Sequence, residues 1–306
     1  MKPIILAWIT LILPAHAWAT VPEFWNLPKT QNPFQTQTRS VPLGTPNAPD
    51  APNTYDESIN LQPGLNLYQS TGELSDLFGT HGSQLCGPTS LAHRFSYFRS
   101  WRKPTVPLAI APDVDGDEIS DTYSDRIRYF FKLCHTDKEE GTHYHELLTC
   151  IQDYIQVSGF KPWAFIVGPH ATENPAGTPG GQQRPLTVND IRTYLSLDAA
   201  LLMGIGWYNH DPITGHYTRT SGHFFNVYGY AYKSAWFQDQ IVLKVVNPVM
   251  DYSGRTPDQM FDDVQMIFKG AQSPDGASYA LDGPGFLPEY HGYVEDIFVA
   301  LPLPKN

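Results

Sequence analysis

The stretch SGHFFNVYGYAYKSAWFQDQIVLKVVNP, residues 221–248, decides which kind of sheet the chain forms. It holds two runs rich in β-branched and aromatic residues, His223–Tyr232 and Gln240–Val246, separated by a polar turn. Two such runs in succession predict neighbouring antiparallel strands. Because the start of one antiparallel strand lies beside the end of the next, the pattern places Asn247 next to His223.

The rest of the chain divides into a helical first half and a strand-rich second half. Helical patterns cover Cys86 to about Trp101, Asp121–Leu133 and Tyr144–Val157, while Trp163–Val167, Ala199–Tyr208 and Val294–Leu301 predict further strands. Thr187 with Asp190 resembles a helix N-cap and first turn. This order predicts an α+β fold and not an alternating parallel sheet.

Length and charge limit the classes of partner. The 306 residues, 41% of them hydrophobic, suffice for one large domain with an extended appendage. The chain has 31 acidic and 20 basic residues, a formal charge of -11. A nucleic-acid or anionic-membrane binder needs a basic face. We therefore expect no nucleic-acid partner. We also expect the protein to be a monomer.

The first residues predict export. Lys2, the apolar run Ile4–Leu13 and the small residues of Ala17-Trp18-Ala19 are typical of a secretory signal peptide, residues 1–19. The apolar run is shorter than the about 20 residues of a membrane span, which favours a signal peptide over the alternative of an uncleaved anchor helix. We expect a secreted or periplasmic protein with no membrane insertion after signal cleavage. Residues 20–60 form a proline-rich extended arm, with a pro-segment as the alternative, and residues 61–306 form the domain.

Three cysteines in an oxidising compartment make one pair and one left over. Cys134 and Cys150 each lie on the apolar stripe of a helical pattern, and a polar turn at 135–142 joins the two patterns. A helical hairpin would bring their sulfurs together, so we predict this disulfide, with two buried free thiols as the alternative. Cys86 is then unpaired.

Cys86 has the setting of a nucleophile. It lies in QLCGPTSLA, residues 84–92, where a Gly-Pro step leads into an amphipathic helix. The positive end of the helix dipole favours thiolate over thiol. With His223 at the mouth of one strand and Asn247 at the end of the next, the three residue types suit acyl transfer through a thioester. A small buried hydrophobe is the alternative role for Cys86, and Asp251 is the alternative third member.

These motifs also resemble a family. CGPTSLA at 86–92, GHF at 222–224 and VNP at 246–248 resemble the papain-like cysteine peptidases of the bacteriocin-processing-peptidase type, in their stand-alone secreted form. The resemblance runs from about Gly82 to Phe268. It implies a papain-like fold whose helical N-terminal half carries the nucleophile and whose antiparallel C-terminal sheet carries the histidine and the asparagine.

For this chain, the resemblance implies a peptidase acting on peptide or protein substrates with no required cofactor. Cys86 would be the nucleophile, His223 the general base and then acid, and Asn247 the residue that orients the imidazole. The same triad could instead pass the acyl group to an amine, as in transglutaminase-like enzymes, or act on peptidoglycan. A binding module with an inactive site is the alternative outside enzymes.

Two departures from the family concern the region just before the nucleophile. Leu85 stands where the family commonly has Asp, and the family's oxyanion Gln lies several residues upstream, where this chain has Thr80 and His81. Gln84 is only two residues from Cys86. The oxyanion donors we predict are the Gln84 side chain and the Cys86 backbone N–H.

A second motif is DVDGDEISD, residues 113–121. Asp113, Asp115, Asp117 and Asp121 resemble the ligands of calcium loops in thrombospondin-type or EF-hand-like repeats. Glu118 occupies the place where such loops prefer Gly. The hypothesis is a structural calcium ion, and the alternative is a solvated acidic loop at the start of the helix that follows.

Overall fold

The computed structural model describes residues 57–60, 69–101, 109–173, 181–197, 199–233, 240–250, 262–269, 273–274, 277–284, 286 and 291–304. All of them belong to one of the two units into which the chain divides, residues 36–306. The predicted signal peptide, most of the proline-rich arm and Asp251 lie outside the described residues.

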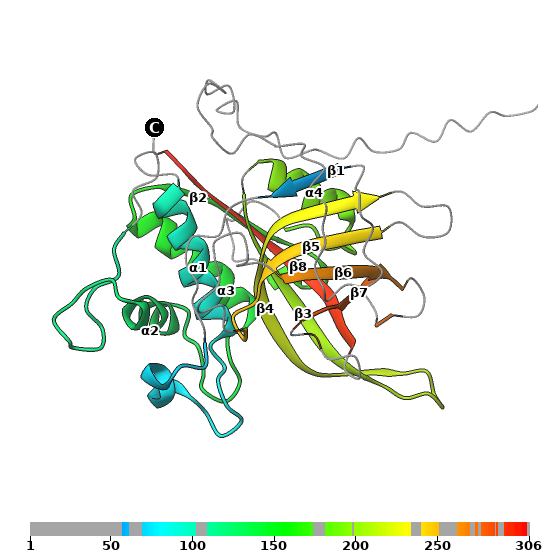
Figure 1. Cartoon of the computed structure of the whole chain (residues 1–306), viewed down its shortest axis with the longest axis horizontal. Coiled ribbons are helices and arrows are strands. Elements are labelled where there is room, and N and C mark those ends of the chain that lie inside the picture. Colours follow the sequence, from blue (N-terminus) through cyan, green and yellow to red (C-terminus); the bar gives the residue numbers. More distant parts are fainter. Residues whose placement is uncertain are drawn as a thin grey trace, which may run out of the picture. The chain divides into compact units, whose positions relative to one another are not determined.

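Three of the described helices, α2, α3 and α4, begin at capping boxes. The helical elements are η2 (Gly72–Leu77), α1 (Cys86–Trp101), α2 (Tyr123–Leu133), α3 (Tyr144–Val157), η3 (Pro169–Glu173) and α4 (Val188–Ser196) (Figure 1). The predicted cap of α4 is confirmed, because the Thr187 hydroxyl accepts from the Asp190 N–H and the Asp190 carboxylate accepts from the Thr187 N–H. Such reciprocal bonds satisfy N–H groups that a helix start leaves without partners.

The sheet closes on itself. Its strands are β1 (Glu57–Asn60), β2 (Lys161–Val167), β3 (Ala200–His210), β4 (Tyr217–Lys233), β5 (Gln240–Val246), β6 (Asp262–Phe268), β7 (Tyr279–Asp282) and β8 (His291–Leu303). The order is β1-β4-β3-β8-β7-β6-β5, β2 pairs with β8, and every pairing between these strands is antiparallel. Because β5 also pairs with β4, the strands from β4 to β5 form a closed ring.

The α+β prediction is confirmed, and so is the antiparallel pairing of β4 with β5. Three strands were not predicted: β1, β6 and β7. In β6, buried Val264 and Met266 alternate with partly exposed residues, which is the period-2 pattern of a half-buried strand. β1 consists of the last four residues of the predicted arm, so the sheet includes residues 57–60.

The first three helices pack together beside the sheet. α1, α2 and α3 lie on one side in Figure 1, whereas α4 lies apart from them near β1. Phe95 of α1, Phe130 of α2 and Tyr154 of α3 form one aromatic cluster, with the Phe95 and Tyr154 ring centroids 4.4 Å apart. The predicted disulfide between Cys134 and Cys150 is confirmed and joins the end of α2 to α3. None of the described helices combines the length and apolarity that crossing a membrane requires.

Candidate active site

Cys86 is the first residue of α1 and the free cysteine of the chain. Leu85, just before it, is fully buried and anchors the turn. Gly87, just after it, lies against Thr142, because a Cβ at Gly87 would be only 3.0 Å from the Thr142 Oγ1. The helix start is therefore fixed by close packing against the segment that leads into α3.

The first two turns of α1 dock on the backbone of β4. The Ser90 hydroxyl donates to the Phe224 carbonyl (3.1 Å), and the Asn226 side-chain amide donates to the Ser90 carbonyl (2.9 Å). The Phe224 backbone also hydrogen-bonds to the Cys86 thiol. Cys86 and Ser90 lie one helical turn apart, and both hydrogen-bond to the backbone of Phe224, the residue that follows His223.

His223 and Asn247 meet as the predicted strand pair requires, but β4 begins at Tyr217, so His223 lies within the strand and not at its mouth. In the β4–β5 pair Asn226 lies opposite Val246, and His223 Nε2 is 2.8 Å from Asn247 Oδ1. His223 is 7% exposed and Asn247 is fully buried. Asn247 Oδ1 also accepts from the Val249 N–H (3.2 Å), which identifies this atom as the acceptor. The Nε2 of a neutral His223 therefore carries the hydrogen, and Nδ1 has the lone pair that can accept a proton.

The pKa shifts of Cys86 and His223 favour the uncharged form of both side chains at neutral pH. Loss of water around the thiol raises the pKa of Cys86, although backbone groups of Phe224, Gly87 and Cys86 itself act in the opposite direction. Burial lowers the pKa of His223 to about 4, although its hydrogen bond to Asn247 opposes the shift. The helix start does favour the thiolate, as predicted, but desolvation outweighs that stabilisation.

Gln84 lies beside the turn that precedes α3. Its Oε1 is 3.5 Å from the position that a Cβ on Gly141 would occupy, and Gly141 has a φ of +84°. The backbone groups of Cys86 and Gly87 are near the thiol. The role of Gln84 as an oxyanion donor stays a prediction.

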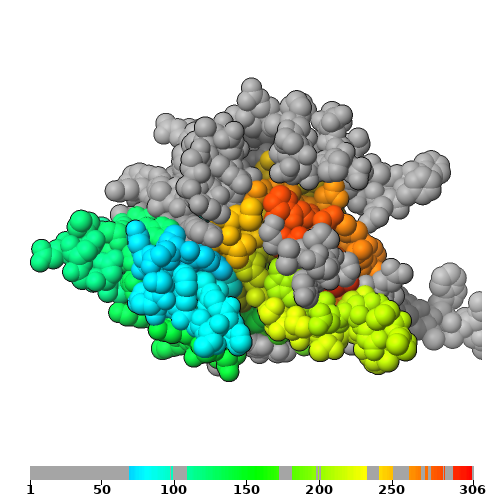
Figure 2. All heavy atoms as spheres, turned by 60° about the horizontal axis from the view of Figure 1, so that its bottom comes forward, coloured from blue at the N-terminus to red at the C-terminus, as the bar shows by residue number. Residues whose placement is uncertain are grey.

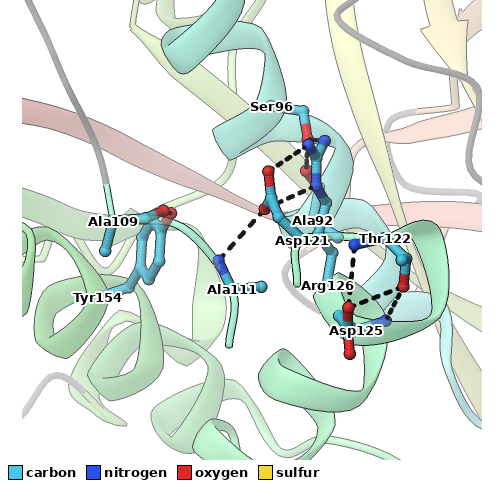
Figure 3. A network of polar contacts seen from close by, with 9 residues as sticks. All are labelled: Ala92, Ser96, Ala109, Ala111, Asp121, Thr122, Asp125, Arg126 and Tyr154. Carbon is cyan, nitrogen blue, oxygen red and sulfur yellow. Dashed lines mark hydrogen bonds and ion pairs between the residues drawn. The ribbon is translucent and has the colours of Figure 1, made fainter. Parts of the chain in front are cut away.

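The aspartate motif is only partly assembled. Carboxylate oxygens of Asp113, Asp115 and Asp117 lie within 4.8 Å of one another, and all three residues are exposed. Asp121 is not part of this group and pairs with Arg126 (2.9 Å), as Figure 3 shows. Glu118 adopts a φ of +69°, the left-handed conformation for which such loops prefer Gly. Three of the four predicted ligands gather, Asp121 does not join them, and calcium binding stays a prediction.

A second acidic group is unsuited to a cation. Atoms of His170, Glu295 and Asp296 also lie within 4.8 Å of one another. Glu295, however, is paired with Arg219 (2.8 Å), and Asp296 with His170 (2.6 Å). The guanidinium already supplies the positive charge that a metal ion would bring.

Sequence reasoning missed several polar residues around the site. Ser90 and Asn226 could have been found, because Ser90 is four residues after Cys86 on one helix face and Asn226 interrupts an apolar strand. Glu295 lies in the predicted strand 294–301, but its partners come from three other elements.

Comparisons of the chain with family models, with curated proteins and with solved structures found no match. The geometry of Cys86, His223 and Asn247 is therefore the basis for assigning a function.

Proposed function

We propose that this protein is a secreted cysteine peptidase with a papain-like arrangement. The observation that carries the proposal is the bond from His223 Nε2 to Asn247 Oδ1, which leaves Nδ1 as the base, together with the docking of Cys86 on the neighbouring Phe224. A thiol on a helix that docks on β4, with an imidazole and an amide on the same closed sheet, has the residue types of nucleophilic acyl transfer.

Catalysis starts from the neutral pair. As the Cys86 sulfur attacks the carbonyl carbon of a peptide bond, His223 Nδ1 takes the thiol proton. The oxyanion accepts hydrogen bonds from the backbone N–H of Cys86 and from the Gln84 amide. The imidazolium then protonates the leaving nitrogen, the C–N bond breaks and a thioester remains. Water, losing a proton to His223, attacks the thioester, and the new acid leaves as the thiol is restored.

Two further observations support the proposed location and substrate class. The Cys134–Cys150 disulfide is typical of proteins in oxidising compartments, which supports export. Figure 2 shows the segment that leads into α1 (cyan) and the β3–β4 hairpin (yellow-green) on the same face of the molecule. The exposed hairpin residues Arg219, Ser221 and Gly222 lead along β4 to His223, so a peptide or protein chain can approach along this face.

The test uses the full chain and a degenerate peptide mixture, with new termini read by mass spectrometry. Cys86→Ala and His223→Ala should each abolish product formation, while His216→Ala, at an exposed histidine of the hairpin, should not. Product formation that persists in Cys86→Ala would contradict the proposal. With a peptide amine added, a peptidase releases mainly free acid, whereas accumulation of the amide adduct would identify an acyl transferase.

A binding module is the second candidate. The pKa shifts of Cys86 and His223 favour it specifically. A raised thiol pKa and a lowered imidazole pKa are the state expected of a buried, inactive cysteine. Iodoacetamide labelling of Cys86 distinguishes the two. In an enzyme, His223→Ala should slow labelling at least tenfold at neutral pH, whereas an inactive site should label slowly in both proteins.

A further inference from the structure

Glu295 of β8 is a buried carboxylate that joins four elements. It is 1% exposed and accepts hydrogen bonds from Tyr144 of α3 (2.6 Å), Tyr208 of β3 (2.5 Å) and Arg219 of β4 (2.8 and 3.0 Å). Burial would raise the pKa of Glu295, but Arg219 and the two phenols hold it below its usual value. The carboxylate is therefore charged at neutral pH, and it ties the helical half of the domain to the sheet.

Glycines on β3 and β4 leave the space that this cluster fills. A Cβ at Gly206 would collide with the Glu295 carboxylate. A Cβ at Gly222 would be 2.5 Å from the Arg219 guanidinium, and one at Gly204 would be 2.9 Å from the Tyr144 hydroxyl. Three glycines on two adjacent strands thus accommodate one polar cluster.

The cluster contacts the residues on both sides of His223. Arg219 lies against Gly222, which comes immediately before His223. The Tyr144 ring packs edge-to-face on Phe224, which comes immediately after it, with centroids 5.3 Å apart. The position of the imidazole along β4 therefore depends on groups that Glu295 holds.

The same cluster reaches the residues around Cys86. Tyr144 is the first residue of α3. Gly141, three residues earlier, lies against Gln84, and Thr142 lies against Gly87. The segment that Tyr144 anchors on Glu295 thus touches the chain just before and just after the nucleophile.

From these contacts we propose that Glu295 is a positioning residue that sets the Cys86 thiol against the His223 imidazole. The inference rests on the proposed function. Glu295 acts through Tyr144 on the turn that holds Cys86, and through Arg219 on the strand that holds His223. Loss of its charge would leave Arg219 without its counter-charge and let the two halves shift relative to each other.

The experiment compares Glu295→Gln with Asp190→Asn in the full chain. Asp190 is a matched control because it is a buried carboxylate that also binds an arginine, Arg184, and a hydroxyl, Thr187. Both variants should lower the melting temperature. Only Glu295→Gln should lower kcat for peptide cleavage, at least tenfold, with KM changed less than twofold, and only it should alter the pH profile of Cys86 labelling.

A pair of milder variants keeps the test decisive if Glu295→Gln does not fold. Tyr144→Phe and Tyr208→Phe each remove one hydroxyl bond to the same carboxylate, but only Tyr144 connects to the Cys86 turn. Tyr144→Phe should lower kcat at least threefold more than Tyr208→Phe does.

The outcomes separate the two proposals. If the wild-type chain cleaves peptides in a Cys86-dependent manner while Glu295→Gln and Tyr144→Phe keep kcat within twofold of it, the positioning role is overturned alone. If the wild type shows no Cys86-dependent cleavage, the proposed function is overturned and the positioning role with it.

Discussion

Two regions of this molecule use cysteine in opposite ways. The hairpin of α2 and α3 is closed by a disulfide between residues 16 apart in the chain, and Phe130 and Tyr154 also join the two helices directly. The Cys86 site joins the start of α1 to β4 and β5, from the other half of the domain. The disulfide contributes to stability, whereas the site depends on how two distant segments are held against each other.

The difference predicts that the two regions can be disabled separately. Cys86→Ala should lower peptide cleavage by at least about 1000-fold, because no other group can form the thioester. Its unfolding free energy should stay near that of the wild type, since only one sulfur is lost. Steady-state cleavage with urea denaturation in parallel measures both quantities, and a large stability loss with retained turnover would contradict the contrast.

Opening the disulfide should have the reverse effect. A bridge that closes a loop of this length contributes about 3 kcal/mol in the chain-entropy model, so Cys134→Ser with Cys150→Ser should lower the unfolding free energy by about that amount. Turnover per folded molecule, measured well below the melting temperature, should match the wild type. Matched loss of kcat would mean that the disulfide itself is needed to position the site.

The site should also make stability depend on pH. The folded-state pKa of His223, about 4, lies below the ordinary 6.5, so between these values the unfolded chain binds the proton more readily. The stability that a neutral His223 contributes is therefore fully present above pH 6.5. It is lost as the pH falls towards 4, which lowers the free energy of unfolding by about 3 kcal/mol. His223→Gln should remove this part of the pH dependence, measured by urea titrations at pH 7 and pH 4. If the variant loses as much unfolding free energy between the two pH values as the wild type does, the prediction is wrong. The disulfide has no proton to exchange in this range.

Asn247 tests how the imidazole is held. Asn247→Ala removes the acceptor on Nε2, so the ring can take the other tautomer and lose the Nδ1 lone pair. We expect kcat to fall about 100-fold. Asn209→Ala, at an exposed position of the hairpin, is the control and should have no effect. Equal kcat in the two variants would show that the hydrogen bond does not orient the ring.

The local region could be predicted almost completely from the sequence. The expected boundaries of α1 and α3 agree with the structure, and the disulfide follows from helical periodicity on the two sides of a short turn. The cap at Thr187 could be predicted because caps depend on residues three apart. Each of these features depends on residues close in the chain.

The distant region could be predicted only where one strand pair decided it. The antiparallel pairing of β4 and β5 was enough to bring Asn247 to His223. The partners of Glu295 depend on α3, β3 and β4 meeting in space, which no local pattern encodes. The rise of the thiol pKa could not be predicted, because the helix start is visible in the sequence but the loss of water around the thiol is not.

The smallest expected effect concerns the contact by which α1 docks on β4. Ser90→Ala removes the hydroxyl bond to the Phe224 carbonyl, which should cost about 1 kcal/mol and lower kcat several-fold, since Cys86 lies one turn away on the same helix. Ser96→Ala is the matched control, because its hydroxyl bonds to Ala92 and Arg126 on the side of α1 that faces α2 (Figure 3). Both variants should lose similar stability, measured by urea denaturation, but only Ser90→Ala should slow turnover. If both slow it equally, general loosening of α1 controls the rate, and the β4 contact has no special part in placing the nucleophile.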